Sequence, residues 1–449
     1  MGFLKIKKLK FTATQVLVIG FFLLIMLGTF LLSLPIASRG GEWGGFVDSL
    51  FTATSATCVT GLIAFDTFSH WTIFGQLVII TLIQIGGIGF MTIISMIAVI
   101  LKKKINLHER LILMQSAGSM QVSGVVTLIR KVVIGTVIFE GLGAIAFATR
   151  FVPKMGWKLG IYNSVFHSIS AFCNAGFDLM GRYQPFSSFT DYTGDVVVNF
   201  TIMLLIIMGG IGFFVWTDLI KKRLKFSKLE LHTKLVIVTT ASLLIVGTAL
   251  CYAFEYNHSL AHLTGWKKLM GAAFMSVTAR TAGFNTVNLS QLSDSGSIIN
   301  DILMFVGGSP GSTAGGIKTT TLAVLILSVI ASVRNNPDIN VFKKRIESRT
   351  VRQATAIATI YFCGFLAATC TICAIESLSI KEVAFEVCSA IGTVGLTMGI
   401  TQSLTDISKV ILALLMFAGR IGGLTFVLGF AQRREIVPVE RPYEKILVG

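Results

Sequence analysis

Four short segments of the chain share one pattern, in which small and apolar residues lead into a glycine that is followed by Leu or Phe. Glycine tolerates positive φ angles, so each segment can turn its backbone carbonyl oxygens toward a common point. Four such loops around one axis would form a ring of oxygens that replaces the water around a dehydrated monovalent cation. The alternative role of these glycines is close helix packing. The segments are Val59-Thr60-Gly61-Leu62, Asn174-Ala175-Gly176-Phe177, Thr281-Ala282-Gly283-Phe284 and Thr393-Val394-Gly395-Leu396.

The composition places these segments in a polytopic membrane protein. Hydrophobic residues make up 53% of the 449 positions and charged residues 13%, and the mean hydropathy is +0.78. A soluble domain of this length could not cover its surface with polar residues at this composition. A membrane-crossing helix needs about 20 apolar residues, and the first apolar stretch is too long for a secretion signal. We predict eight spans, at residues 12–35, 73–101, 126–149, 196–220, 235–254, 299–333, 353–375 and 407–430.

The spans fall into four repeats. Within each pair of spans, a short apolar stretch ends at the pattern glycine and is too short to cross, which predicts re-entrant half-helices at residues 46–57, 161–172, 266–277 and 381–389. Each second span also carries a glycine cluster: Gly86-Gly87-Ile88-Gly89, Gly209-Gly210-Ile211-Gly212, Gly307-Gly308 and Gly419-Arg420-Ile421-Gly422-Gly423. Every repeat crosses the membrane an even number of times, so all four loops face the same side of the membrane. Inverted repeats would instead need an odd number of crossings in each repeat.

The predicted fold is therefore an all-α membrane protein with pseudo-fourfold symmetry around a central pore. We assign residues 1–11 and 432–449 to cytoplasmic tails and residues 12–101, 102–220, 221–333 and 334–431 to the four repeats. The net charge of +16 comes from basic clusters at alternate span ends, including residues 102–104, 221–223, 343–345 and 433–434. The positive-inside rule then places both termini in the cytoplasm. Nucleic-acid binding is disfavoured, because no aromatic platform is interleaved with these basic residues.

The third repeat contains a polar interruption at the depth of the membrane. Proline and clustered glycines break helical hydrogen bonding, so this segment could occlude the path below the four loops and act as a gate. Its spacing nearly matches a nucleotide-binding P-loop, but Ile317 intervenes before Lys318 and apolar spans flank it, so we predict no nucleotide on this chain. Lys318 is expected to pair with a carbonyl or an acid, Asp301 or Asp218. The segment is Gly307-Gly308-Ser309-Pro310-Gly311-Ser312-Thr313-Ala314-Gly315-Gly316.

Arg420 is a second polar outlier inside an apolar span. A charge in the membrane faces the bundle interior or a wet cavity, so Arg420 could be an electrostatic barrier in the pore or one half of a structural salt bridge. Arg280, just before the third loop, could hold loop carbonyls or charge the vestibule. Asn174, Asn285 and Asp178 could shape the outer mouth or cap loops.

Catalysis is not predicted. The six histidines are scattered, and only His258 and His262 are four residues apart, without the glutamate of a zinc-protease motif. The seven cysteines are an odd number in apolar or loop segments, and no disulfide framework or metal spacing emerges from them.

The four loops, the eight spans and the long glycine-rich third repeat resemble the Trk/Ktr/HKT superfamily of potassium transporters, most closely the membrane (KtrB-type) subunit of bacterial Ktr uptake systems. The resemblance spans residues 12–431. It implies a potassium ion held at Gly61, Gly176, Gly283 and Gly395, a gating loop in the third repeat, and possible activation by sodium.

The resemblance also implies a homodimer in a bacterial cell membrane, with a cytosolic nucleotide-binding regulatory ring of the RCK/KTN type on the basic loops. Only Thr393-Val394-Gly395 keeps the Thr-Val-Gly of simple potassium channels, and no loop has their second glycine. This departure implies a short filter. A sodium-coupled or sodium-permeable transporter of the same fold is the alternative function.

Overall fold

The computed structural model describes residues 12–89, 92–93, 96, 125–430 and 444. The predicted cytoplasmic tails lie almost wholly outside the described residues, as do the basic clusters at residues 102–104 and 433–434. Within the described part, α-helices dominate and the one strand pair is a small hairpin of β1 (Asn340–Val341) and β2 (Lys344–Arg345). Hydrophobic, small and straight-chain residues favour helices, and backbone groups inside a membrane must be satisfied within the segment.

The helices follow the predicted order of the repeats. The first repeat contains α1 (Ala13–Ser33), α2 (Phe46–Cys58) and α3 (Ile73–Ile88), and the second contains α6 (Val125–Met155), α7 (Trp157–Phe172), α8 (Val196–Gly210) and α9 (Phe213–Lys221). The third contains α10 (Leu231–Glu255), α11 (Trp266–Thr278), α12 (Asp294–Phe305) and α13 (Thr319–Val333). The fourth contains α14 (Ser348–Ile375), α15 (Ile380–Gly392), α16 (Asp406–Ile421) and α17 (Gly423–Phe430). Short 3-10 turns η1–η5 lie at Met180–Arg182, Thr190–Tyr192, Phe226–Lys228, Leu289–Gln291 and Thr401–Ser403.

The first span and the short half-helix of every repeat are confirmed as helices. The four predicted half-helices correspond to α2, α7, α11 and α15, which we call the pore helices. Local signals set several of these ends. Thr12 and Ser379 begin α1 and α15 with capping boxes, in which the side chain of the residue three positions later reaches back to the cap backbone.

The second spans are predicted as helices with glycines inside them, and an interruption is predicted only in the third repeat, but the helix is broken in every repeat. In three repeats the helix stops at an equivalent glycine with positive φ, namely Gly89 (φ 90°), Gly212 (φ 98°) and Gly422 (φ 97°). A positive φ cannot continue a right-handed helix, so the chain changes direction there, and α8 and α9 form a 90° bend. The third repeat has instead a loop of residues 306–318, which we call the interrupting loop, between α12 and α13. The predicted end of the second span near residue 101 lies outside the described residues.

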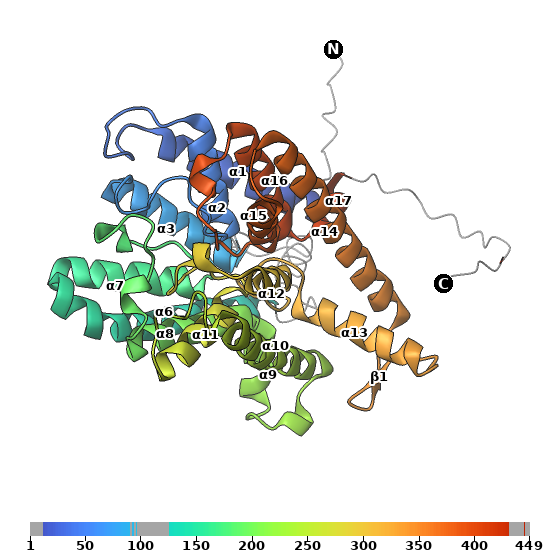
Figure 1. Cartoon of the computed structure of the whole chain (residues 1–449). Helices are drawn as coiled ribbons and strands as arrows, with labels where there is room; N and C mark the ends of the chain where they lie inside the picture. Colours follow the sequence, from blue (N-terminus) through green and yellow to red (C-terminus); the bar gives the residue numbers. More distant parts are fainter. Residues whose placement is uncertain (1–11, 90–91, 94–95, 97–124, 431–443, 445–449) are drawn as a thin grey trace, which may run out of the picture.

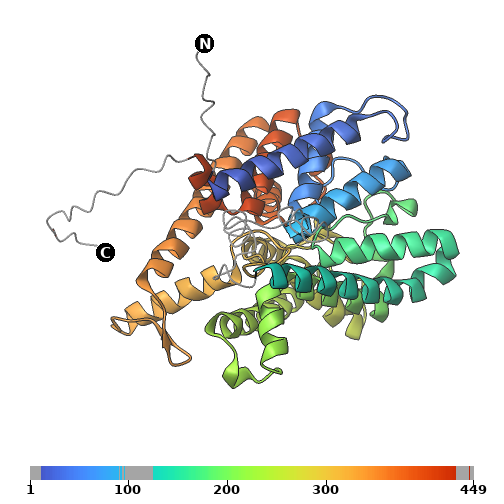
Figure 2. The same cartoon turned by 180° about the vertical axis from the view of Figure 1, so that it is seen from behind.

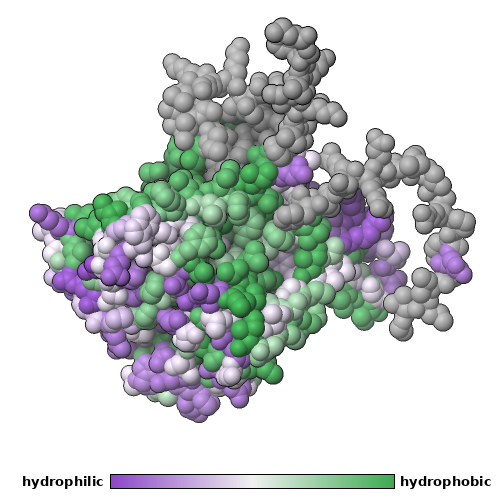
Figure 3. Space-filling model, turned by 90° about the horizontal axis from the view of Figure 1, so that it is seen from above, coloured by the Kyte–Doolittle hydropathy of each residue, from purple (hydrophilic) through white to green (hydrophobic). Residues whose placement is uncertain are grey.

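Length and apolar composition mark out the membrane-crossing helices. Four described helices are long and apolar enough to cross, α1, α6, α10 and α14, and the bent pair α8 and α9 makes up to five. The shorter apolar helices α3 and α13 do not reach that length. The long helices α1, α6 and α10 carry large exposed apolar side chains such as Leu23, Ile145 and Ile245. Figure 3 shows a broad hydrophobic zone on one face with hydrophilic residues beside it, as a lipid-facing surface requires.

The repeats follow one another around the molecule, so that the first and the last are neighbours (Figures 1 and 2). Polar contacts join each neighbouring pair. Lys409 of α16 forms an ion pair with Asp48 of α2 at 2.7 Å, and Lys381 of α15 with Asp294 of α12 at 2.8 Å. Hydrogen bonds make the other two junctions. The Phe186 amide donates to the Asp66 carboxylate (3.1 Å) between repeats 2 and 1, and the Thr193 hydroxyl donates to the Thr286 carbonyl (2.5 Å) between repeats 2 and 3. The fold thus closes on itself around a centre to which the four pore helices point.

Candidate ion-binding site

The four pattern glycines form a closed ring of contacts. Their φ angles are 98° at Gly61, 70° at Gly176, 83° at Gly283 and 90° at Gly395, which favour glycine over any other residue. Each glycine also faces a carbonyl oxygen of the next loop, which belongs to the residue that precedes the glycine of that loop. A Cβ added at Gly61, Gly176 or Gly283 would lie 2.5–2.6 Å from the oxygen of Ala175, Ala282 or Val394, and one at Gly395 closer still to the oxygen of Thr60. The fourth loop therefore meets the first, and we call this arrangement the glycine ring.

Each loop of the ring begins with a turn out of its pore helix. The first loop residue has a positive φ in every repeat: 57° at Val59, 60° at Asn174, 71° at Thr281 and 53° at Thr393. A left-handed residue ends an α-helix and leaves its last carbonyls free of helical partners. The C-terminal ends of all four pore helices thus meet at the ring, where the partial negative charge of the helix dipole favours a cation.

The orientation of the loop carbonyls follows from the amide groups behind them. The Gly61 amide donates to the Ser55 hydroxyl and the Gly395 amide to the Ser389 hydroxyl, both at 3.0 Å. In a planar trans peptide the carbonyl points opposite to the amide of the next residue. The Thr60 and Val394 carbonyls therefore point away from their own pore helices and toward the ring.

Hydroxyl groups behind the loops are functional residues that the sequence analysis missed. In the second and third repeats the hydroxyl acts as a donor: Ser170 bonds the Phe177 carbonyl at 2.7 Å and Thr278 the Phe284 carbonyl at 2.6 Å. The four hydroxyls lie five or six residues before the ring glycines, a spacing that could have been recognised in the sequence. They hold each loop to its own helix.

Glycines of the second spans make room for the pore helices. Gly86 packs on the carbonyl of Thr57, and the equivalent pairs are Gly209 with Phe172 and Gly419 with Ile391, each too close for a Cβ. In every pair the carbonyl belongs to the residue four positions before the ring glycine. Close packing, which was the alternative role for the ring glycines, is thus the role of these span glycines.

The interrupting loop lies directly against the ring. An added Cβ at Gly307 would lie 3.1 Å from Cγ2 of Thr281, and one at Gly315 would collide with the side chain of Thr393. The loop is fastened to the second repeat by backbone hydrogen bonds. The Ser309 amide donates to Gly210 (2.9 Å), and the Phe213 amide to Gly311 (2.8 Å). The predicted gate residues are therefore brought to the ring, and they lie next to the break in the second span of repeat 2.

Of the two partners expected for Lys318, a carbonyl or an acid, the described residues supply carbonyls. The Lys318 Nζ donates to the carbonyls of Ala314 (2.6 Å) and Gly315 (3.3 Å), and neither Asp301 nor Asp218 forms an ion pair with it among the described residues. Asp218 instead accepts the amide of Glu230 at 2.9 Å. The loop is short enough for Lys318 to fold back on carbonyls within four residues, which explains why a distant acid is not used.

Arg420 is fastened to backbone as well. Its guanidinium donates to the carbonyls of Thr313 in the interrupting loop and of Gly86 and Gly87 at the end of α3, the last at 2.9 Å. The ion pairs among the described residues do not include Arg420, whose guanidinium is used there on backbone carbonyls. The planar fork of arginine suits several carbonyls at once, and the helix breaks supply free ones. A barrier role for Arg420 in a pore stays a prediction.

The remaining predicted residues surround the ring. The Asn174 side-chain amide and the Thr281 hydroxyl are hydrogen-bonded at 3.2 Å, which joins the second and third loops. Asn285 donates to the Val287 carbonyl (3.2 Å) and Asp178 accepts the amide of Met180 (2.9 Å), so both cap loops. Arg280 is buried, and its Nε has no hydrogen-bond partner among the described residues.

Comparisons with known proteins agree with this architecture. The family model described as TrkH, cation transport protein, matches residues 12–436. The chain is 40% identical to the potassium/sodium uptake protein NtpJ of Enterococcus hirae, covering 98% of each chain. It is 41% identical to the Ktr system potassium uptake protein B of Bacillus subtilis, covering 96% of this chain and 95% of the relative. Among solved structures, the potassium transporter TrkH of Vibrio parahaemolyticus matches with a TM-score of 0.75 at 15% identity, over 95% and 86% of the two chains.

The packing of the span glycines gives a test of the site's construction. Replacing Gly209 by Ala puts a methyl group against the Phe172 carbonyl and 2.8 Å from the Thr313 hydroxyl. We expect a loss of about 1–3 kcal/mol, the usual cost of overpacking, seen as a lower midpoint of thermal unfolding in detergent. Gly141→Ala is the matched control, because its added Cβ meets no described atom within 4 Å apart from its chain neighbours and the backbone of its own helix. Equal midpoints for the two variants would contradict the tight fit.

Proposed function

Because this chain belongs to the TrkH family of cation transport proteins, a family of transporters and not of enzymes, we propose that it is the potassium-translocating pore subunit of a Ktr-type uptake system. The observation that carries the proposal is the closed glycine ring, in which four similar loops meet around one centre. The names of the relatives in Enterococcus hirae and Bacillus subtilis, both potassium uptake proteins, support the choice of ion. The chain is a multi-pass membrane protein, and the inward negative potential would drive uptake.

The ring residues are assigned as a selectivity filter. Carbonyls of Val59, Thr60 and Gly61 and of the equivalent residues in the other loops would replace the hydration shell of potassium. The C-terminal ends of four pore helices add negative potential at the same place. The hydroxyls behind the loops supply stiffness, because each ties its loop to a helix and limits how far the carbonyls can follow a smaller ion.

The interrupting loop is assigned as the gate. It lies against Thr281 and Thr393 of the filter and is fastened at two points, to the break between α8 and α9 and to Arg420 of the fourth repeat. Releasing it requires that these hydrogen bonds be exchanged for others, which water in the pore can supply. Arg420 then acts as a latch, and its charge would also oppose a cation below the filter.

The assembly follows from the same family assignment. We propose a homodimer in the bacterial cell membrane with both termini in the cytoplasm and a nucleotide-binding regulatory ring of the RCK/KTN type on the basic loops. Arg345, Arg349 and Arg352 line one open cavity of about 500 Å³ on such a loop. Sodium is assigned as an activator. A sodium-coupled or sodium-permeable transporter is the second candidate, favoured by the name of the Enterococcus hirae relative.

Cation flux into liposomes that contain only this chain tests the function. With a clamped negative-inside potential, we expect entry of potassium or rubidium in preference to sodium, and flux that rises when a nucleotide-loaded regulatory ring is added. Entry of more than one charge per potassium, with a strict need for a sodium gradient, would favour the coupled transporter. No flux with the regulatory ring present would contradict the proposal.

Gly61→Ser tests the filter assignment. The new Cβ would lie 2.5 Å from the Ala175 carbonyl on a backbone with φ 98°, so one side of the ring must move. We expect the ratio of rubidium to sodium flux to fall by about tenfold or more, since about 1.4 kcal/mol of discrimination is a factor of ten. Gly41→Ser is the matched control, because exposed Gly41 also has a positive φ (68°) but an added Cβ there meets no atom within 4 Å apart from its chain neighbours. The assignment fails if Gly61→Ser keeps the selectivity of the unmodified chain.

Deletion of residues 309–313 tests the gate. It removes the amide of Ser309 that binds Gly210 and the Thr313 carbonyl that binds Arg420. We expect several-fold higher rubidium flux without the regulatory ring and unchanged preference over sodium. Size-exclusion chromatography checks that the variant is folded. Flux at the level of the unmodified chain in a folded variant would show that this loop does not limit permeation.

A further inference from the structure

A glutamate lies inside the membrane-crossing helix α6 and belongs to neither the filter nor the gate. Glu140 is half-buried, and its Oε2 accepts a hydrogen bond from Nε2 of Gln84 at 3.1 Å. An acidic residue in a membrane-crossing segment is costly, and it faces the bundle interior with a polar partner. Gln84 belongs to α3 of the first repeat, so this hydrogen bond joins the first repeat to the second.

Cys173 completes the contact. Its thiol donates to Oε1 of Gln84 at 3.5 Å and lies 3.9 Å from Oε1 of Glu140. Cys173 is fully buried at the C-terminal end of the pore helix α7. A Cβ added at Gly87 would lie 2.6 Å from its sulfur, so the thiol is packed closely against α3. We call Gln84, Glu140 and Cys173 the support cluster, in which the Gln84 amide bridges the acid and the end of the pore helix.

The residues on either side of Cys173 contact the gate and the next filter loop. The Phe172 carbonyl accepts the hydroxyl of Thr313 in the interrupting loop at 3.2 Å. The Asn174 side chain is hydrogen-bonded to the Thr281 hydroxyl of the third loop, also at 3.2 Å. Consecutive residues share rigid planar peptide groups, so a shift of Cys173 would move both of these neighbours.

At the junction between the second and third repeats, an apolar residue takes the place of Glu140. The Ser168 hydroxyl donates to the backbone carbonyl of Glu140 at 2.6 Å. In the third repeat the Ser276 hydroxyl donates in the same way to the carbonyl of Leu244 at 3.2 Å. Both serines belong to pore helices and both carbonyls to the first long helix of their repeat. Leu244 is therefore the structural equivalent of Glu140.

The place of Gln84 is apolar at that junction as well. Gln84 lies two residues before Gly86, and Ile207 lies two residues before the equivalent Gly209. Ile207 and Leu244 both pack against the largest hydrophobic core of the described residues. Apolar side chains thus suffice to hold two neighbouring repeats together. The polar pair at the first junction has to serve another purpose.

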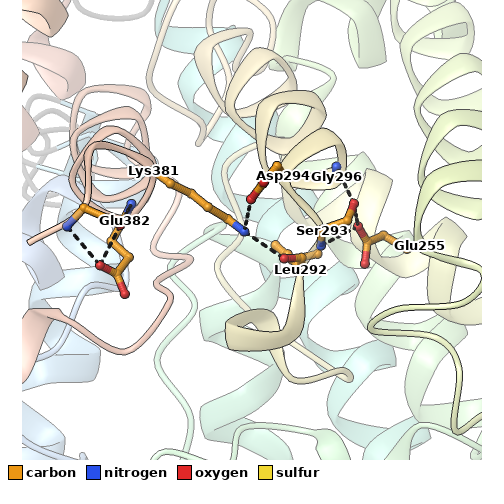
Figure 4. Close-up of polar contacts among 8 residues, drawn as sticks. Glu255, Leu292, Ser293, Asp294, Gly296, Lys381 and Glu382 are labelled. Atoms are coloured by element: carbon orange, nitrogen blue, oxygen red, sulfur yellow. Dashed lines mark hydrogen bonds and ion pairs between the residues drawn. The ribbon is translucent and has the colours of Figure 1, made fainter.

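Glu255 shows how a carboxylate of this chain serves a purely local role. It is fully buried and accepts the amides of Ser259 (3.1 Å) and Ser293 (3.0 Å) and the Ser293 hydroxyl (2.6 Å). Figure 4 shows this cluster at the start of α12, with the Lys381 and Asp294 ion pair beside it. All partners of Glu255 in the cluster belong to its own repeat, whereas Glu140 binds a side chain of another repeat.

We propose that Glu140 and Gln84 are positioning residues for ion selectivity, which hold Cys173 and thereby fix the second loop of the glycine ring. The inference rests on the proposed function, because it takes the ring as the selectivity filter. Hydrogen bonds prefer a narrow range of distances and angles, whereas apolar contacts are non-directional and allow side chains to slide. The support cluster therefore fixes the end of α7 more exactly than an apolar pair would.

The second loop needs this support because its own hydroxyl holds it at a different point. In the first and fourth loops a serine hydroxyl accepts the amide of the ring glycine itself. In the second loop the Ser170 hydroxyl instead binds the Phe177 carbonyl, on the outward side of Gly176. The support cluster holds the other side of the same loop, where the chain leaves the pore helix.

Cation flux into liposomes with single and double variants tests the proposal. Glu140→Leu and Gln84→Leu each leave a polar partner unpaired, and we expect the ratio of rubidium to sodium flux to fall by about two- to tenfold, the effect of one lost hydrogen bond. Combining both changes gives the apolar pair of the next junction, so the double variant should recover most of the ratio. Glu140→Gln keeps an acceptor oxygen for Gln84 and should also keep the ratio.

Gln76→Leu is the matched control. Gln76 is a buried glutamine of the same helix α3, and its Oε1 accepts the Tyr162 hydroxyl of the second repeat at 3.0 Å. It lies about two helical turns before Gln84. This variant removes a polar contact between the same two repeats, so it should lower the midpoint of thermal unfolding and leave the flux ratio unchanged.

If Glu140→Leu or Gln84→Leu does not fold, Cys173→Ala is measured in its place, and it should lower the ratio by about twofold or more. The inference is overturned if these variants keep the ratio of the unmodified chain, or if the loss in the double variant is the product of the two single losses. Failure of the proposed function looks different, because the unmodified chain would then show no preference for rubidium over sodium and Gly61→Ser would change nothing.

Discussion

Backbone amides and carbonyls at the depth of a membrane need partners within the protein, and the architecture of this chain depends on that constraint. Each loop of the glycine ring satisfies its amides on hydroxyls or carbonyls of its own pore helix, through Ser55, Ser170, Thr278 and Ser389 or their backbone. Peptide planarity then sends the carbonyls the other way. The same bonds that make the loops tolerable in the membrane therefore aim their oxygens at a common centre.

The helix breaks obey the same constraint. Where α3, α8 and α16 end at glycines with positive φ, carbonyls lose their helical partners, and groups from another repeat bind several of them. Arg420 binds Gly86 and Gly87, while the interrupting loop binds Gly209 and Gly210. The breaks thus supply the acceptors on which the third and fourth repeats depend. A loop fastened through such exchangeable bonds suits a gate better than one packed by apolar side chains.

The sequence predicts the parts of this structure that depend on composition and on local signals. The pore helices and the ring glycines are found because apolar length and a recurring glycine are visible in the sequence. The breaks at Gly89, Gly212 and Gly422 are not, since hydropathy averages over a window and does not register one dihedral angle. The partners of Lys318 and Arg420 are carbonyls, which every residue has, so no residue type distinguishes them. The hydroxyls behind the loops could have been found, because their spacing from the glycines recurs.

The contact between Gly395 and Thr60 has a consequence for biosynthesis. The two residues lie at opposite ends of the chain, and the neighbouring ion pair joins Asp48 to Lys409. The first loop can meet the second loop early in synthesis, but its contact with the fourth loop forms only after most of the chain has been made. Until then two of the four contacts between neighbouring loops are missing, namely the two that the fourth loop makes. The arrival of the fourth loop is thus the step that closes the ring.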